Sequence, residues 1–169
     1  MKEFLALVNK LKIPVVAGWN AHDVLANDSP YFAGRPGTVG DRAGNFTVQN
    51  ADFLIVLGCR LNIRQVSYNW QSFAKNAWKV MVDIDRAELD KPTLQTDLKI
   101  QADLRNFIPK LTLALNDFLS PESHQKYLNW CKDRVLKYPT VLAEYKCRSA
   151  TVNPYVFIEE LFKHLGYDD

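Results

Sequence analysis

The pattern of apolar and polar positions divides the chain into short strands and helices that alternate. Four apolar runs predict β-strands, and they lie at residues 13–17, 53–57, 79–84 and 98–102. The run at 53–57, FLIVL, contains no polar residue, which is typical of a strand buried on both faces of a parallel sheet. Helical spacing of apolar residues between these runs completes the alternation. The pattern therefore predicts an α/β fold with helices on both faces of a parallel sheet.

Three stretches predict the helices that flank the first runs. Residues 4–11 and 46–49 show helical spacing, and the aromatic-rich stretch 66–78 predicts a short helix whose rings cover the sheet. The chain thus opens on a helix rather than on a strand with a glycine-rich turn behind it. We therefore expect a sheet that lacks its first strand, in a polypeptide that starts inside a domain.

Residues that suit an anionic ligand follow the run at 53–57. The carboxyl ends of parallel strands form the ligand crevice of an open sheet, so Gly58, Arg60 and Arg64 are expected at that edge. Gly58 allows close backbone approach, and guanidiniums bind a phosphate or carboxylate with paired hydrogen bonds. The alternative is that both arginines only cap a helix or pair with nearby carboxylates.

Two carboxylates, Asp83 and Asp85, stand at the end of the next strand. A carboxylate there often accepts hydrogen bonds from ribose hydroxyls, and Asp83 is the better candidate. Asp85 is equally well placed to cap a helix that starts at residue 86. Because proline is tolerated only in a first helical turn, Pro109 favours Asn106 over Asp103 as the cap of the following helix.

The least regular stretch carries glycines at positions 34, 37, 40 and 44. They provide positive-φ positions and room for a ligand to touch backbone amides, although the same residues would serve a tight surface loop. His22 is interpreted as an exposed loop residue, because no second His, Cys or carboxylate stands at metal-ligand spacing. No metal site is predicted.

Composition excludes several classes of protein. Net charge is +2, with 21 basic and 19 acidic residues that form no run, so no nucleic-acid or anionic-membrane partner is expected. The sequence has no apolar segment of membrane-spanning length, and its start has no signal-peptide pattern, so a cytoplasmic protein is expected. Three widely spaced cysteines, without C-x-x-C, fit reduced thiols.

From residue 116 onward the pattern contains no further strand. A helix-like run ends at Pro139, and a polar segment follows. Asn153 and Pro154 then begin a helix with a cap and a first-position proline, and Gly166 stops it. We expect a domain at 1–115, a helical linker at 116–152 and the opening of another domain at 153–169.

Residues 1–115 resemble the central domain of thiamine-diphosphate-dependent enzymes of the acetolactate synthase type. The segments LVNKLKIPVV, GRPGTVGDRAGN, VQNADFLIVLGCR, FAKNAWKVMVDID and LKIQADL follow one another in the order and separation of that family. The resemblance implies a three-layer, Rossmann-like sheet of the DHS-like FAD/NAD-binding type. It also implies that residues 153–169 are the first helix of a thiamine-diphosphate domain.

The resemblance implies 2-oxo acid decarboxylation and carboligation by a longer parent enzyme. Thiamine diphosphate and magnesium would be held by its other domains, so no catalytic residue is assigned in this chain. The family's central domain binds FAD in some members and ADP in others. Carried over by position, the residues that would hold FAD or ADP are Gly37, Gly58, Arg60, Arg64, Asp83 and Asp103.

The expected partners are the remaining domains of the parent enzyme and further copies of the chain in a homo-oligomer. The alternative is a non-catalytic nucleotide-binding or subunit-assembly module. A sheet without its first strand would have unpaired edges, which also favour self-association.

Overall fold

Three parallel strands form the sheet around which the chain folds, in the order β1-β2-β3. The structure is a computed structural model that describes residues 1–147 and 151–166. The strands are β1 Phe53–Leu57, β2 Trp78–Asp83 and β3 Leu98–Gln101. They confirm three of the four predicted runs to within one residue at each end. Within these described residues the sheet is small and open and lacks a first strand of the Rossmann-like three-layer fold, and β1 lies at its edge.

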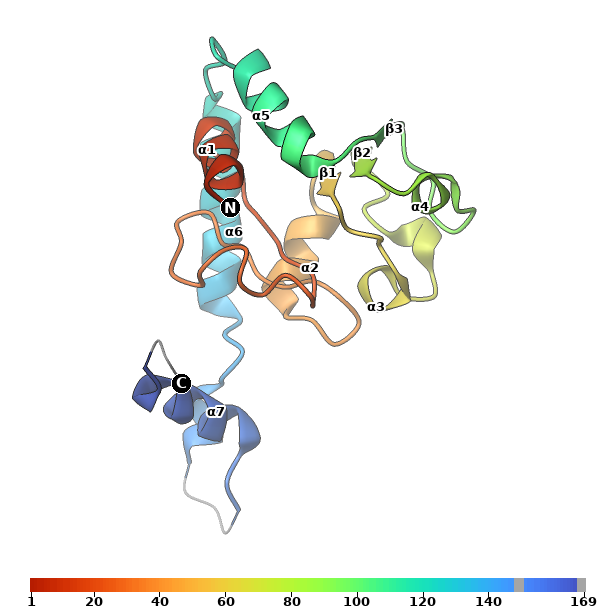
Figure 1. The fold of residues 1–169 in the computed structure, drawn as a ribbon. Helices are drawn as coiled ribbons and strands as arrows, with labels where there is room; N and C mark the ends of the chain where they lie inside the picture. Colours follow the sequence, from red (N-terminus) through yellow and green to blue (C-terminus); the bar gives the residue numbers. More distant parts are fainter. Residues whose placement is uncertain (148–150, 167–169) are drawn as a thin grey trace.

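Helices and short 3-10 turns connect and cover the strands (Figure 1). In chain order they are α1 Lys2–Leu11, α2 Arg42–Gln49, α3 Ile63–Val66, η1 Trp70–Ser72, α4 Arg86–Asp90, α5 Leu104–Ala114, α6 Glu122–Lys137, η2 Ala143–Lys146 and α7 Pro154–His164. α1 packs along α5, and α2 packs along α6. Short polar side chains cap the amino ends of α2, α3, α4, α5 and α7.

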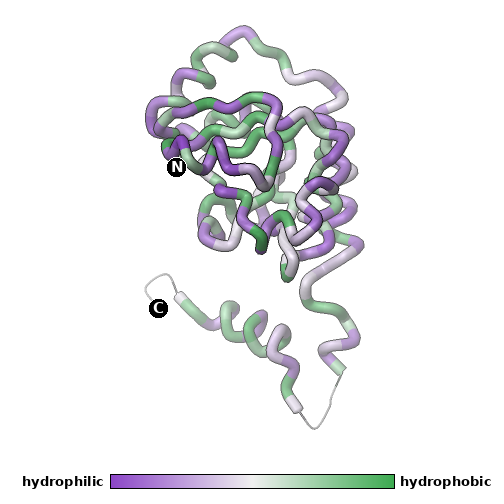
Figure 2. The backbone as a smooth tube through the Cα atoms, turned by 90° about the vertical axis from the view of Figure 1, so that its right-hand side faces the viewer, coloured by the Kyte–Doolittle hydropathy of each residue, from purple (hydrophilic) through white to green (hydrophobic). Residues whose placement is uncertain are grey.

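The main core lies between the sheet and the helices α2, α3 and α4. Its central residues are Val56 of β1 and Met81 of β2, and Val48, Val66 and Leu89 meet them from the three helices. Met81, Val82 and Leu89 are almost completely buried. In Figure 2 green, hydrophobic stretches run through the middle of the main body, and the helix near the C-terminus carries both green and purple residues.

The strand predicted at residues 13–17 does not form, so this prediction is wrong. This segment forms only one isolated parallel bridge, between Val15 and Phe32. Its hydrogen bonds run from Val15 N–H to the Tyr31 carbonyl (2.8 Å) and from Ala33 N–H to the Val15 carbonyl (2.9 Å). The partner segment belongs to the glycine-containing loop, which turns away before a ladder can form.

Two helix predictions also need correction. The stretch 66–78 is not one helix, because α3 stops at Val66, Ser67 adopts a φ of +65°, and only η1 follows. Asp103, not Asn106, caps α5 by accepting a hydrogen bond from Arg105 N–H, so Pro109 lies inside the helix. Pro109 has no N–H to donate to the helix. Its ring is exposed, and the residues on both sides of it remain helical.

The carboxyl-terminal part contains α6, η2 and α7, and both views show α7 lying away from the sheet (Figures 1 and 2). Asn153 caps α7 and Pro154 is its first residue, as the sequence predicts. Residues 148–150 and 167–169, which belong to the predicted linker and last segment, lie outside the described residues. None of the helices in the described ranges is both long and apolar enough to cross a bilayer.

Candidate functional site

Gly58 ends β1 in a left-handed conformation, with φ of +58°. Its N–H donates to the Val82 carbonyl (2.9 Å), which keeps it in the sheet. A Cβ atom added at Gly58 would lie 2.9 Å from Leu104 Cδ1. Glycine is required here because the chain turns and the first residue of α5 approaches closely.

Arg60 extends from this turn over α4. Its Nε lies 3.4 Å from Glu88 Oε1, and Lys91 Nζ donates to the Arg60 carbonyl. The side chain of Arg60 is 67% exposed, so the ion pair is worth little in stability. The guanidinium stands at the carboxyl edge of the sheet, accessible to a ligand and paired on one side only.

The two predicted carboxylates both have structural partners. Asp83 is buried and accepts a hydrogen bond from Asp85 N–H (2.9 Å), while Asp85 caps α4 through Ala87 N–H (2.9 Å). Asp103 caps α5 and pairs with Arg105 at 2.7 Å. The hydrogen bond from the Arg105 side chain lowers the pKa of Asp103. The capping role proposed for Asp85 is confirmed, and Asp83 is a turn-forming residue whatever else it binds.

Gly37 and Arg64 meet where the glycine loop contacts α3. Thr38 N–H donates to the Arg64 carbonyl (2.7 Å), and a Cβ atom at Gly37 would lie 2.7 Å from the same oxygen. Gly37 has a φ of +147°, and the Arg64 guanidinium lies 5.6 Å from the centre of the Trp19 ring. The fold therefore joins the glycine loop to α3, and it leaves the cation of Arg64 on an aromatic surface rather than on a carboxylate.

The amides of the glycine loop are occupied within the loop itself. Asp41 accepts from the N–H groups of Arg35 and Gly44, and Asn45 accepts from Gly37 N–H. The Asn45 amide also donates to the Gly37 carbonyl (3.1 Å). These bonds favour the tight-loop alternative, because the amides that could contact an anion are already satisfied.

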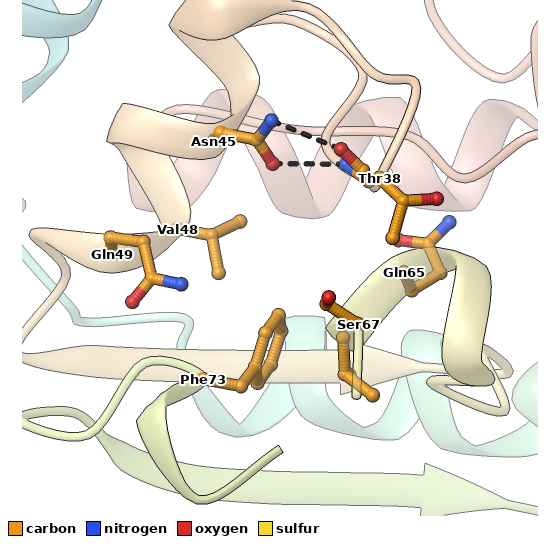
Figure 3. A pocket seen from close by; sticks show the side chains of 9 residues that line it. Thr38, Asn45, Val48, Gln49, Gln65, Ser67 and Phe73 are labelled. Atoms are coloured by element: carbon orange, nitrogen blue, oxygen red, sulfur yellow. Dashed lines mark hydrogen bonds between the residues drawn. The ribbon is translucent and has the colours of Figure 1, made fainter. Parts of the chain in front are cut away.

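A pocket of about 280 Å³ opens between this loop, α2 and α3 (Figure 3). Its lining residues are Gly37, Thr38, Asn45, Val48, Gln49, Gln65, Val66, Ser67 and Phe73. Only Gly37 of these was predicted as a site residue. The others have no motif that identifies them, since they come from the glycine loop, α2, the end of α3 and the end of η1, and meet only in the folded chain.

The remaining chemistry-bearing residues are not assembled into a site. The His22 carbonyl accepts from the Arg35 guanidinium (3.2 Å), and its side chain is exposed, as the loop interpretation requires. Within 1–147 and 151–166, no three His, Cys, Asp or Glu side chains are grouped to hold a metal ion. The three cysteines are unpaired, and burial raises the pKa of the Cys59 thiol.

Comparison with known proteins adds a second line of observation. The family model described as "Thiamine pyrophosphate enzyme, central domain" matches residues 1–111. The chain is 35% identical to the acetolactate synthase isozyme 2 large subunit of Escherichia coli over 118 residues, which is 70% of this chain and 21% of that protein.

Two further relatives extend the comparison. The acetolactate synthase large subunit of Lactococcus lactis is 39% identical over 113 residues, covering 67% of this chain and 19% of that protein. The acetolactate synthase large subunit of Pyropia yezoensis is 30% identical over 156 residues, covering 90% of this chain and 25% of that protein. The chain thus spans about a fifth to a quarter of the length of the relatives it matches.

Proposed function

Because this chain belongs to the family of thiamine pyrophosphate enzyme central domains, we propose that it acts as the central domain of an acetolactate synthase-like enzyme. That enzyme would decarboxylate a 2-oxo acid and join the product to an acceptor. The match over residues 1–111, in a chain folded as a parallel α/β sheet, supports the assignment.

Thiamine diphosphate and its magnesium ion would be held by other domains of that enzyme. A magnesium ion takes oxygen ligands, usually from carboxylates, and the described part of this chain offers no cluster of them. This domain would then contribute scaffold and, at the sheet edge, a nucleotide site. Thiamine diphosphate, when bound, supplies the carbanion chemistry of such enzymes.

We place a nucleotide, FAD or ADP, at the carboxyl edge of the sheet. The observation that carries this proposal is the exposed Arg60 guanidinium beside the positive-φ turn at Gly58. Open parallel sheets bind ligands outside the carboxyl ends of their strands, and arginine meets phosphate with a planar fork of donors. The pocket of about 280 Å³ beside the glycine loop would hold at most part of a dinucleotide, since pockets for whole drug-sized ligands span about 300–1,000 Å³.

Replacing Arg60 tests this site. We expect Arg60→Ala to weaken FAD or ADP binding by about 1.5–3 kcal/mol, as for a hydrogen bond to a charged group. The melting temperature should stay nearly constant, because most of the Arg60 side chain is exposed and Glu88 keeps its ion pair with Lys91. Isothermal titration and thermal unfolding measure the two effects. Lys126→Ala, which breaks the exposed pair of Lys126 with Glu122 on α6, is the matched control.

Arg60→Lys should restore binding only in part, because an ammonium keeps the charge but loses the fork. If Arg60→Ala binds FAD or ADP with unchanged affinity, Arg60 does not contact the nucleotide. Loss of stability without loss of affinity would instead make it a structural residue.

A subunit-assembly role is the second candidate, and one observation favours it. Phe53, Trp78 and Leu98, at the amino ends of the three strands, are 48%, 46% and 41% exposed. If the purified protein shows no flavin absorbance and takes up neither FAD nor ADP, assembly becomes the better proposal.

A further inference from the structure

Helix α6 lies beyond the part of the chain that the family model matches, yet it contributes to the core. The match ends at residue 111, and α6 begins at Glu122. Leu128 is 4% exposed and Cys131 is 0% exposed, and the helix packs along α2. Few contacts cross a linker between domains, so burial of this extent indicates that α6 belongs to the domain itself.

The start of α6 is bound to the end of α1. His124 Nδ1 lies 2.8 Å from the Leu11 carbonyl, and this nitrogen carries a proton because a carbonyl can only accept. Ser120, just before the helix, donates its hydroxyl to the same carbonyl (3.0 Å). Leu11 is the last residue of α1, so a carbonyl without a partner inside its own helix is satisfied from a segment 109 residues later.

The middle of α6 is bound to α2 and to the loop before it. The Tyr127 hydroxyl donates to the Thr47 carbonyl (2.5 Å). Lys132 Nζ donates to the Ser29 carbonyl (3.1 Å). Hydrogen bonds depend on direction as well as distance, so these contacts fix the position of α6 along its axis and not only its separation from α2.

The end of α6 is held by aromatic and cation–π contacts with α2. The Tyr138 ring lies 5.3 Å from the Phe46 ring, and the Arg42 guanidinium lies 4.6 Å from the centre of the Tyr138 ring. Lys137 Nζ lies 5.6 Å from the same centre. Arg42 and Phe46 both belong to α2, so the chain stays against this helix as far as Tyr138.

The chain leaves the domain directly after Tyr138. Helical backbone is disfavoured at the residue before a proline, and Tyr138, which precedes Pro139, has φ of −125° and ψ of 64°. Within 139–147 and 151–166 no residue is buried. Both views show the chain running from the end of α6 to α7 away from the sheet (Figures 1 and 2).

The elements beyond this point, η2 and α7, contact each other. The Tyr145 and Tyr155 rings stack at 6.0 Å, and Lys146 Nζ lies 2.6 Å from Glu159 Oε2. An isolated helix as short as the 11 residues of α7 is marginally stable in water, and α7 has no buried residue. This segment therefore depends on its own contacts, whereas α6 depends on those of the domain.

We propose that α6 is a rigid part of the domain and that the hinge of the chain lies at residues 139–142, between Tyr138 and η2. The 16 residues of α6, rising about 1.5 Å each, carry the chain about 24 Å from the end of α1 towards the start of α2. The point at which the chain leaves the domain is thus set by Tyr138 and not by the end of α5. In the enzyme proposed above, this point would fix where the next domain begins.

Hydrogen–deuterium exchange of the intact chain, followed by mass spectrometry of its peptides, tests this division. Exchange at a packed helix requires local opening of the core, so α6 should exchange as slowly as α2. The exposed helix α7 should exchange about tenfold faster or more. Exchange of α6 at the rate of α7 would make α6 a linker, and slow exchange throughout α7 would contradict the hinge.

Variants on the two sides of the hinge test the contacts at Tyr138. Tyr138→Ala removes the ring that meets Arg42 and Phe46, so exchange in the last turn of α6 should accelerate about threefold or more. Tyr138→Phe keeps the ring and should exchange as the wild type does. Tyr145→Ala, which loses the stack with Tyr155, is the matched control and should leave exchange in α6 unchanged.

Two further results of the variant series would overturn the proposal. One is that Tyr138→Ala leaves exchange in the last turn of α6 unchanged, since the ring would then not hold the end of the helix. The other is that Tyr145→Ala accelerates exchange throughout α6, since the two sides would then form one unit. The exchange pattern is independent of FAD or ADP, so a failure of the nucleotide site in titrations leaves this test standing, and the reverse is also true.

Discussion

Several residues at the sheet edge already make hydrogen bonds or packing contacts within the protein, which limits the contacts they can make with a ligand. Asp83 and Asp103 satisfy backbone donors, and Gly58 admits Leu104. Arg60 and Arg64 differ, because the Arg60 guanidinium is mostly exposed beside Glu88 and the Arg64 guanidinium lies over the Trp19 ring. Ligand-dependent effects are therefore expected at the arginines, and effects on stability at the glycines and aspartates.

Gly37→Ala tests this distinction at one position. The new Cβ would lie 2.7 Å from the Arg64 carbonyl, at a φ of +147° that alanine rarely adopts. We expect the variant to lose roughly 1–2 kcal/mol or more of unfolding free energy, measured by urea denaturation. Gly18→Ala is the control, since its φ is ordinary and its Cβ would meet only the flexible end of Gln65. Equal stability of the two variants would contradict the structural role of Gly37.

At the scale of elements, one partly buried polar contact joins α6 to α2. The Tyr127 hydroxyl on α6 donates to the Thr47 carbonyl on α2 at 2.5 Å, and Cys131 next to it is completely buried. Burial, with Cys131 adding to it, raises the pKa of Tyr127 far above its usual range. The helix pair is thus stabilised by a phenol that must stay neutral.

Tyr127→Phe should lower the unfolding free energy by about 0.5–1.5 kcal/mol at pH 7. The folded-state pKa lies above the unfolded value of about 10, so the phenol's contribution is complete below pH 10 and is lost as the pH rises further. The wild type should therefore lose stability more steeply than Tyr127→Phe above pH 10, in denaturant titrations at each pH. Tyr68→Phe, at an 82% exposed tyrosine, should follow the wild type.

The proline inside α5 gives a second prediction at this scale. Pro109 provides no N–H for the helix, and its side chain is exposed, so alanine would fit without repacking. Pro109→Ala should raise the unfolding free energy by roughly 1–3 kcal/mol. Lys110→Ala, at the exposed neighbour, should change it little. A destabilised Pro109→Ala would show that the proline is needed for the shape of α5.

At the scale of the whole molecule, the sheet leaves apolar surface uncovered. β1 has a strand on one side only, and its apolar sequence contains none of the lysines or prolines that protect edge strands. The Phe53 and Trp78 rings stack at 5.5 Å beside that edge. We expect these features to drive self-association.

Light scattering over a concentration series measures this association. Trp78→Lys should shift the protein toward monomer, because it places a charge on the exposed aromatic pair. Leu119→Lys, at an 87% exposed leucine in the segment between α5 and α6, should leave the association unchanged. A wild-type protein that stays monomeric at high concentration would contradict the expectation.

The sequence by itself determined the elements whose signal is local. The apolar run of β1, the cap of α4 at Asp85 and the start of α7 at Asn153 and Pro154 all depend on neighbouring residues, and all are present in the structure. The order of its segments also indicated the family, because many weak local matches in one order are collectively specific.

The tertiary structure decided the features that depend on residues far apart in the sequence. Residues 13–17 have strand-like composition, but a strand needs a ladder, and the fold supplies only the bridge to Phe32. Pro109 stays inside α5 because Asp103 caps the helix three residues earlier than the proline rule predicted. The pocket forms where the glycine loop, α2 and α3 converge. Gln49 and Ser67 both line it, although the spacing of residues in the sequence does not predict that they share a pocket.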